Sequence, residues 1–506
     1  MMRRGVISVY LSIAAALLFS VILVSLESVR TAIIRTSSQR WSDMAAEMVF
    51  SGYVQPLADQ YGLFVLDAGE GFGRLDNFRQ FAGANMKSAA AAPAGPFQIR
   101  AEISDSSASS FTRLEDQDWK FLLEQIAKRE KLELAEKGLK KITSPADVSS
   151  AESVKKRFAG ELDQAEQQAR QEAAAQEDDR TSPEKDSAQT VESTGPRIED
   201  PRPGIGQLLR RGLVSLVMNG RSVSDRSIRP DSCTYSTGAE KQTDLITNFG
   251  NALSVRKKLS SFHFSSAVSA GLNMAMLNLY ISDFFTDAAD REEGDMAHAL
   301  LYEKEYILCG HADDQRNLEG TLRRIFALRS MLNLAWLYSS PDAAARLTDA
   351  AAQIAVSALP GAGQLVRLLL MVCWAGAEAA VDCAGLIDGK KVPIWKNSST
   401  WNLSLDQLVL LAKGQAGISD FAKDSSSGLD YHGYLDLLLS GVGKDKKIRR
   451  MLSLMELNVR MAEGYENFSF ANSLQGAAFQ LDLTMQPAFW KHGPGISWHL
   501  NTVYGY

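Results

Sequence analysis

The chain has 506 residues, of which 45% are hydrophobic and 23% are charged, and its formal net charge at pH 7 is −6. This length and apolar content suffice for two or three domains with cores of their own. The acidic balance argues against a nucleic-acid groove, so no nucleic-acid partner is expected.

The first predicted element is a membrane-spanning helix. The run GVISVYLSIAAALLFSVILVSL, from Gly5 to Leu26, holds 22 residues without a charge, and at about 1.5 Å per residue it covers the roughly 30 Å hydrocarbon slab. Two arginines precede it and no clear small-residue cleavage site follows, which favours an uncleaved signal anchor over a removed signal peptide. We predict a cytoplasmic tip over 1–5 and a single transmembrane helix over 6–26 of the cell membrane, with the bulk of the chain extracellular.

The helical pattern continues beyond this segment. Apolar residues recur at helical spacing with no proline before Pro56, which predicts one long helix running out of the bilayer. The predicted stripe consists of Leu26, Val29, Ile33, Ile34, Trp41, Met44, Ala45 and Met48. Such a helix resembles that of pilin subunits, where it serves as membrane anchor and assembly element. Pilins usually carry a glutamate five residues after their processing site, and the residue five beyond Gly5 is Tyr10.

Residues 27–111 are predicted to hold the helix extension and a small β element. The apolar run Tyr61 to Asp67 and the alternating run Phe97 to Ile103 are strand candidates. Through 112–175 apolar residues recur at three and four, which predicts a coiled-coil-like helical arm. The arm either folds into an intramolecular hairpin, which we favour, or seats another subunit. The polar stretch 176–204 is predicted to be a flexible linker.

Residues 205–467 carry a series of helix patterns and are predicted to form an α-helical ectodomain. The predicted helices are Ala267 to Ala288, Gly294 to Leu308, Asn317 to Tyr338, Pro341 to Ala358, Gly363 to Ile387, Ser404 to Lys413 and Tyr431 to Arg460. The tail 468–506 changes to alternating patterns and predicts one or two strands. The expected fold class is mainly α (α+β), with small antiparallel β elements.

The segment Gly363 to Ile387 is apolar enough to raise the question of a second membrane span. Arg367, Glu378 and Asp382 interrupt it, and a charge at mid-membrane costs about 2.5–3.5 kcal/mol, so a buried core helix is favoured. Glu378 and Asp382 lie four residues apart on one helix face. We predict that all three are structural buried charges, with arginines of 316–329 as candidate partners, rather than groups for general acid/base work.

Candidate chemistry is sparse. The sequence holds no H-E-x-x-H, no G-x-S-x-G and no metal-spaced His/Cys cluster. The glycine runs GEGFG and GVGK lack nucleotide-binding context and are predicted to be turns. The densest ligand-type group, His298, Glu303, Glu305 and His311, does not have the spacing of a known metal site. We therefore predict no metal, no cofactor and no enzymatic activity.

Two of the four cysteines, Cys373 and Cys383, lie ten residues apart in the Ala-rich segment. Small buried thiols are favoured over a disulfide between them.

Two stretches resemble a known family. RGVISVYLSIAAALLFSVILVSLESVRTAIIR, with the later YGLFVLD, looks like the opening of a family of uncharacterised Gram-positive membrane proteins, and LYEKEYILCGHADDQRNLEGTLRRIFALRSMLNLAWL is similar to their core. The most specific element is E-Y-I-L-x-G at Glu305 to Gly310. The resemblance implies association with tight-adherence (Tad, Flp-type) pilus gene clusters that encode TadE/TadG-like pseudopilins, and it implies no active site.

The expected function is that of a membrane-anchored extracytoplasmic structural or accessory protein, whose partners are the membrane, pilus or secretion-system subunits and further copies of itself. Small side chains in the span would let helices approach closely in lipid. The candidate assembly residues are Ser8, Ser12, Ala14, Ala15, Ala16 and the register charge Glu27. An alternative is an extracytoplasmic sensor that binds a ligand and signals through a partner membrane helix, and a third interpretation is an extracytoplasmic hydrolase.

Overall fold

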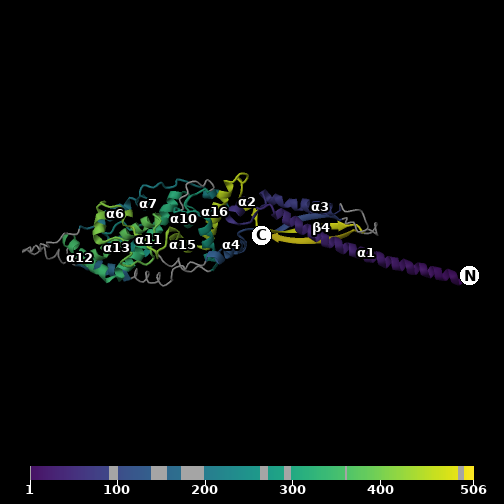
Figure 1. Ribbon diagram of the computed structural model, residues 1–506, viewed down its shortest axis with the longest axis horizontal. Coiled ribbons are helices and arrows are strands. Elements are labelled where there is room, and N and C mark those ends of the chain that lie inside the picture. Colours follow the sequence, from purple (N-terminus) through teal and green to yellow (C-terminus); the bar gives the residue numbers. More distant parts are fainter. Residues whose placement is uncertain are drawn as a thin grey trace, which may run out of the picture. The chain divides into compact units, whose positions relative to one another are not determined.

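The computed structural model describes residues 2–90, 101–137, 157–171, 199–261, 272–289, 298–358, 362–487 and 495–506. The chain forms two compact units (Figure 1). The first, here the sheet unit, joins the two ends of the chain, Met1–Arg129 and Ala462–Tyr506. The second, the helical unit, is Glu130–Met461. The predicted class, mainly helical with small antiparallel β elements, is confirmed.

The sheet unit is built on one long helix. Helix α1 (Met2–Phe50) is continuous, as predicted. Its second half packs against helix α3 (Asn77–Ala90) and strand β5 (Ile496–Gly505). Strands β2 (Ala101–Thr112), β4 (Gly476–Met485) and β5 form an antiparallel sheet in the order β2-β4-β5. In Figure 1, α1 and α3 lie along these strands.

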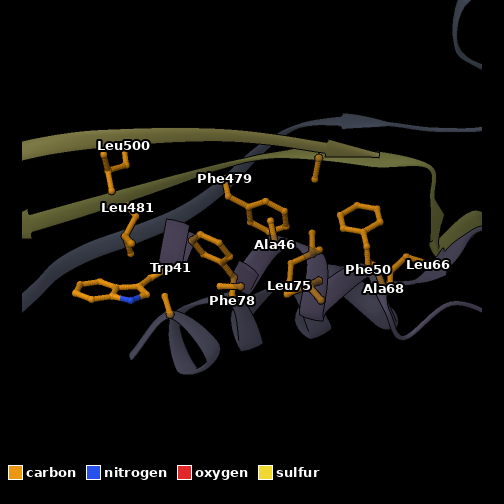
Figure 2. Close-up of a cluster of buried hydrophobic side chains, with 14 of the residues drawn as sticks. Trp41, Ala46, Phe50, Leu66, Ala68, Leu75, Phe78, Phe479, Leu481 and Leu500 are labelled. Atoms are coloured by element: carbon orange, nitrogen blue, oxygen red, sulfur yellow. The ribbon is translucent and has the colours of Figure 1, made fainter. Parts of the chain in front are cut away.

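The core of the sheet unit lies between these helices and the sheet. Figure 2 shows side chains of α1 and α3 pointing toward β4 and β5. Phe479 of β4 stacks on Phe78 of α3 with ring centroids 4.4 Å apart, and it meets Phe50 of α1 edge-on at 6.2 Å. Aromatic pairs of this geometry stabilise by about 0.5–1.5 kcal/mol beyond their area burial. The two ends of the chain are therefore held together by one apolar core.

Short elements close the sheet unit. Helix α2 (Gln55–Tyr61) ends at Gly62, whose φ of 63° is left-handed, and strand β1 (Leu66–Asp67) then pairs with β3 (Ser473–Leu474). The predicted strand over Tyr61 to Asp67 is thus only its last two residues. The 3₁₀ segments of this unit are η1 (Glu70–Asp76), which contains part of GEGFG, and η4 (Phe470–Asn472).

The predicted arm over 112–175 is divided between the units. Helix α4 is Asp116–Lys137. In its first half, which belongs to the sheet unit, the Gln125 side chain donates to the Phe64 carbonyl and accepts from the Phe64 backbone N–H. Residues 157–171 are helical within the helical unit, where Phe158 packs on Tyr338. Both stretches have buried apolar side chains, Leu122 and Ile126 in α4 and Phe158 and Leu162 in the second stretch. Residues 138–156 and 172–175 of the predicted arm, most of the predicted linker (176–198 of 176–204) and the start of the second predicted strand, Phe97 to Arg100, lie outside the described residues.

The helical unit is centred on helix α13 (Gly363–Ile387), which packs against α6, α7, α11, α12 and α14. Every residue from Leu368 to Ile387 is buried, so the interpretation as a core helix is confirmed. The elements of this unit are α6 (Arg202–Arg210), α7 (Leu213–Met218), η2 (Pro230–Ser232), α8 (Ala252–Ser261), α9 (Leu272–Phe284), α10 (Glu303–Cys309), α11 (Asp314–Ser339), α12 (Pro341–Ala358), α14 (Leu405–Ala412), η3 (Ser419–Phe421), α15 (Tyr431–Ser440) and α16 (Lys444–Arg460).

Several helix boundaries in this unit follow the sequence signals closely, but others do not. The predicted helix Gly294 to Leu308 is helical only from Glu303, because residues 298–302 have no helical structure, and α9 ends at Phe284 rather than at Ala288. Pro341–Ala358 and Gly363–Ile387 match the prediction, and Ser404 closes a capping box on α14. The predicted helix Tyr431 to Arg460 is two helices, because the chain turns at Gly441 to Gly443 before α16 begins. The GVGK run is thus a turn between helices, as predicted.

Candidate functional site

The first candidate site is the N-terminal half of α1. Large apolar side chains from Ile7 to Val24 are 38–77% exposed, on all sides of the helix. The Ser12 hydroxyl donates to the Val9 carbonyl at 2.9 Å, so this polar group is satisfied within the helix. By length and composition this part of α1 is a candidate membrane span. The other helix that is apolar enough, α13, is buried inside the helical unit.

The exposed apolar segment ends at an ion pair. Arg30 donates to Glu27 at 2.8 Å, both side chains are buried, and Arg30 also donates to the Gln486 carbonyl at 3.3 Å. Glu27, the predicted register charge, thus lies in a buried ion pair within its own chain.

Beyond Glu27, α1 has two distinct faces. The buried face combines apolar Ile34, Trp41 and Ala45 with Ser38 and Ser42. The Ser42 hydroxyl lies 2.8 Å from that of Thr502 on β5, which satisfies it inside the core.

The other face carries the rest of the predicted stripe. Val29, Ile33, Met44 and Met48 are 43–52% exposed. Their spacings of four, eleven and four residues put them on one flank of the helix. We call these four residues the exposed flank of α1.

The second candidate site is a buried charge cluster around α13. Glu378 and Asp382, four residues apart, both accept from the ammonium of Lys396, at 2.5 Å for Asp382. Asp382 also accepts from Nε of Arg329 on α11 at 3.0 Å. All four side chains are at most 1% exposed. Two cations and two carboxylates therefore balance inside the helical unit.

Neutral groups complete the cluster and fix a loop on it. Glu378 accepts from the backbone N–H groups of Asn402 at 2.8 Å and Leu403 at 2.9 Å. The Arg329 guanidinium donates to the carbonyls of Pro393 at 2.9 Å and Ile394 at 2.7 Å. The cluster thus clamps the segment after α13 onto the helix through charge-assisted bonds.

The electrostatics differ between the two acids. Burial raises the pKa of the Glu378 carboxyl above its ordinary value, although Lys396 opposes this. Burial acts in the same direction on Asp382, but the charges of Lys396 and Arg329 outweigh it and hold the pKa of Asp382 below its ordinary value.

The prediction that Arg367 belongs to this buried group is wrong. Arg367 lies near the start of α13, where that helix still reaches the surface, and its Nε donates to Gln364 at 3.1 Å. Lys396 takes the second cationic position, and sequence reasoning missed it because it lies in a loop 14 residues after Asp382. The available signal was charge balance, since two buried acids need a second cation. The predicted partner region, 316–329, does supply Arg329.

A polar cavity of about 260 Å³ lies over the cluster. The residues that line it share a polar character, except for Val392 and Pro393, and they are Asp382, Val392, Pro393, Lys396, Ser399, Thr400, Asn402, Lys423, Asp424, Ser425 and Ser426. Buried Asp382, Lys396 and Asn402 contribute to its lining, whereas Ser399, Lys423, Asp424 and Ser426 are exposed. The cavity therefore connects surface hydroxyls with buried charges.

The four ligand-type residues predicted around α10 do not meet at one point. His298 lies 3.0 Å from Glu303, whereas Glu305 accepts from the Tyr431 hydroxyl at 2.8 Å. His311 instead donates its backbone N–H to Asn317 at 2.8 Å. Across the described residues no group of three or more His, Cys, Asp or Glu could hold a metal ion.

The E-Y-I-L-x-G element has a structural explanation. Gly310 ends α10 with a left-handed φ of 76°. A Cβ there would lie 2.6 Å from the Arg450 guanidinium, which donates to the carbonyls of Ile307 at 3.0 Å and Leu308 at 2.9 Å. Only glycine allows both the turn and this close approach.

The cysteines contribute no disulfide in this fold. Cys233, Cys309, Cys373 and Cys383 are free and buried, so the interpretation of Cys373 and Cys383 as small buried thiols is confirmed.

Fold and sites together define a mainly helical protein with a candidate membrane span at its N-terminus and a helical unit organised around a buried charge cluster. Residues 191–485 match the model of a family described as Family of unknown function (DUF5702). Because the match covers more than half of the 506 residues, the chain belongs to this family. The matched range contains α6 to α16 and ends with the last residue of β4. No curated protein and no solved structure matches the chain.

Proposed function

We propose that this protein is a single-pass membrane protein that serves as a structural or accessory subunit of a pilus or secretion apparatus and binds its partners through α1. Its N-terminus would lie in the cytoplasm and both compact units outside the cell. The observation that carries the proposal is the exposure of apolar side chains along α1, first on all sides from Ile7 to Val24 and then on one flank from Val29 to Met48.

The first exposed stretch supports membrane insertion. Full burial of one large apolar side chain stabilises by about 1.5–3 kcal/mol relative to water. The stretch from Ile7 to Val24 presents a continuous series of them without a charge. Within it, Ser8, Ser12 and Ala16 are spaced at four and share one face with Ala15 beside them, whereas Ala14 lies on the other side of the helix. A partner helix could approach closely at either small-residue position in lipid.

The exposed flank supports contacts outside the bilayer. A helix that only anchored a domain would need no apolar side chains on the side away from its sheet. On α1, however, Val29, Ile33, Met44 and Met48 stay exposed while the neighbouring face packs on β5. An apolar helix of another subunit, including a second copy of this chain, would cover this flank by packing side chains between its own.

The identity of the partner rests on the sequence resemblance. The opening and core stretches resemble proteins associated with Tad-type pilus genes, and the description of the matched family assigns no function. An extracytoplasmic hydrolase receives less support, because both acids of the α13 cluster are paired with buried cations.

Cysteine crosslinking in native membranes tests the proposal. The four native cysteines are buried, so single cysteines at Ala16, Val29 or Met44 can be oxidised or crosslinked selectively. We expect each to yield a crosslinked product that contains a pilus or secretion subunit or a second copy. The matched control is Arg35→Cys, which is exposed on the opposite flank of the same helix and should yield little product.

Two further results decide the outcome. Replacement of Val6 to Leu26 by an unrelated span should keep the protein in the membrane but abolish the product at Ala16→Cys. Equal products at Met44→Cys and Arg35→Cys, or none at any position, would contradict assembly through α1. Digestion of intact cells by an added protease should remove the two compact units, and their protection would contradict the proposed orientation.

A further inference from the structure

We propose that the helical unit binds a small uncharged, hydroxyl-rich ligand, a sugar or a polyol, in the polar cavity above the Glu378–Asp382–Lys396 cluster. This inference goes beyond assembly through α1, since it concerns the helical unit alone. It rests on three properties of the cavity: its size, its balance of charge and its hydrogen-bonding groups.

The size of the cavity fits a small molecule. A single water needs about 10–15 Å³ of such space, and this cavity offers about 260 Å³. Its buried end is formed by polar groups, including Asp382 and Asn402. A polar occupant is favoured there over an apolar one, because it can form hydrogen bonds with these groups.

The charge of the lining favours an uncharged ligand. At the buried end, Asp382 and Lys396 carry opposite charges, and at the exposed end Lys423 and Asp424 do the same. The remaining two members of the cluster, Glu378 and Arg329, also cancel. An isolated anion would therefore face two carboxylates, and an isolated cation would face two ammonium groups, so neither gains a net attraction.

The hydrogen-bonding groups match hydroxyls, which both donate and accept. Lys396 has three ammonium protons, and in the described part of the chain it donates to Glu378 and Asp382. The third proton can therefore serve a ligand oxygen.

The rest of the lining adds groups of both kinds. Asn402 donates one amide proton to Asp382 at 3.0 Å and keeps a second donor. The hydroxyls of Ser399, Thr400, Ser425 and Ser426 surround the exposed end. Those of Ser399 and Thr400 already donate to Asn397 and can still accept from a ligand, whereas that of Ser426 can donate or accept.

Rigidity of the buried end strengthens the case. Lys396 is held by two carboxylates and lies 5.4 Å from the centroid of the Trp401 ring. Asn402 is fixed through its backbone by Glu378 and through its side chain by Asp382. Groups already ordered before binding lose little entropy when a ligand arrives.

Saturation-transfer NMR with the full-length protein in detergent micelles tests the proposal. The uncharged probes are glucose, N-acetylglucosamine and glycerol, and the charged comparators are glucose 6-phosphate and glucosamine. We expect saturation transfer to at least one uncharged probe, and weaker transfer to both comparators.

The variant Ser426→Leu introduces an apolar side chain at the exposed wall of the cavity, and its matched control, Ser427→Leu, changes the adjacent exposed serine that does not line it. Ser426→Leu should weaken binding at least about fivefold, while Ser427→Leu should bind like the wild type. Both variants should keep the thermal unfolding midpoint of the wild type, which separates loss of binding from loss of fold.

Three results would overturn the proposal. They are the absence of transfer to every uncharged probe, equal binding by the two serine variants, and stronger binding of glucose 6-phosphate or glucosamine than of glucose. The last result would assign the cavity to a charged ligand instead.

Discussion

At the scale of single residues, Lys396 is the side chain on which the buried cluster depends, because one ammonium neutralises two carboxylates. We predict that Lys396→Met lowers the free energy of unfolding by about 3–5 kcal/mol, since it leaves Glu378 and Asp382 with only Arg329 as a buried cation. Chemical denaturation of the full-length protein, followed by circular dichroism, measures this loss. Arg367→Met is the control on the same helix and should change stability by less than about 0.5 kcal/mol. Similar losses in both variants would contradict the assignment.

The same residues show how far sequence reasoning reaches at this scale. The spacing of Glu378 and Asp382 predicted their shared face and their pairing, because helical geometry is local. Arg367 precedes Glu378 by eleven residues, about three turns, so spacing alone puts it on the same side. Burial of that side sets in only near Leu368, and which turn of a helix is covered depends on tertiary packing. The position of Lys396 depends on the path of a loop, which no periodicity encodes.

At the scale of elements, helix α10 contacts α15 of the helical unit through the buried carboxyl of Glu305, which accepts from Tyr431. Burial and the neighbouring Asp287 raise the pKa of Glu305 to about 8 from an ordinary 4.5. Between these values the folded protein holds a proton that the unfolded chain releases, so this group makes stability fall as pH rises through that window. The glutamine of Glu305→Gln stays neutral at every pH. We therefore predict that the free energy of unfolding of this variant, relative to that of the wild type, rises by a few kcal/mol between about pH 5 and pH 8.

Denaturation at several pH values measures this difference. The control is Glu319→Gln on α11, which replaces a partly exposed carboxylate paired with Arg323 at 2.6 Å. Its difference from the wild type in free energy of unfolding should vary by less than about 0.5 kcal/mol across the pH range. If the difference in free energy of unfolding between Glu305→Gln and the wild type were also independent of pH, Glu305 would not hold the proton.

Elements differ in how well the sequence predicts them. Helices α11 to α14 were predicted within a few residues because their apolar period and their caps are local signals. Strand β2 was predicted only at its start, since its sequence ISDSSASSFT is mostly serine and alanine and has little alternation. On α1 the apolar stripe pointed to Met44 and Met48, yet the buried face includes Ser38 and Ser42. A hydrogen bond to Thr502 on β5 compensates the burial of the Ser42 hydroxyl.

At the scale of the whole molecule, the first compact unit is discontinuous. The predicted C-terminal β tail over 468–506 was treated as a separate segment, but β4 pairs with β2, and Ile103 faces Leu483 across 380 residues of chain. Strand pairing at such separation leaves no trace in local periodicity, and it carries a large loop-closure entropy. The intervening helical unit shortens this loop by folding on its own core.

This architecture predicts that the sheet unit can unfold while the helical unit stays folded. Phe479 is fully buried at the centre of the sheet-unit core, and Phe479→Ala should destabilise that unit by about 3–5 kcal/mol. Hydrogen exchange measured by mass spectrometry on the full-length protein should then show faster exchange in the second half of α1, in α3 and in β5, while α11 and α13 keep their protection. Val503→Ala, on the same sheet at a side chain that is 81% exposed, should leave both patterns unchanged. If α11 and α13 lost protection together with α1, the two units would unfold as one, and the pairing of the chain ends would stabilise the whole molecule rather than the sheet unit alone.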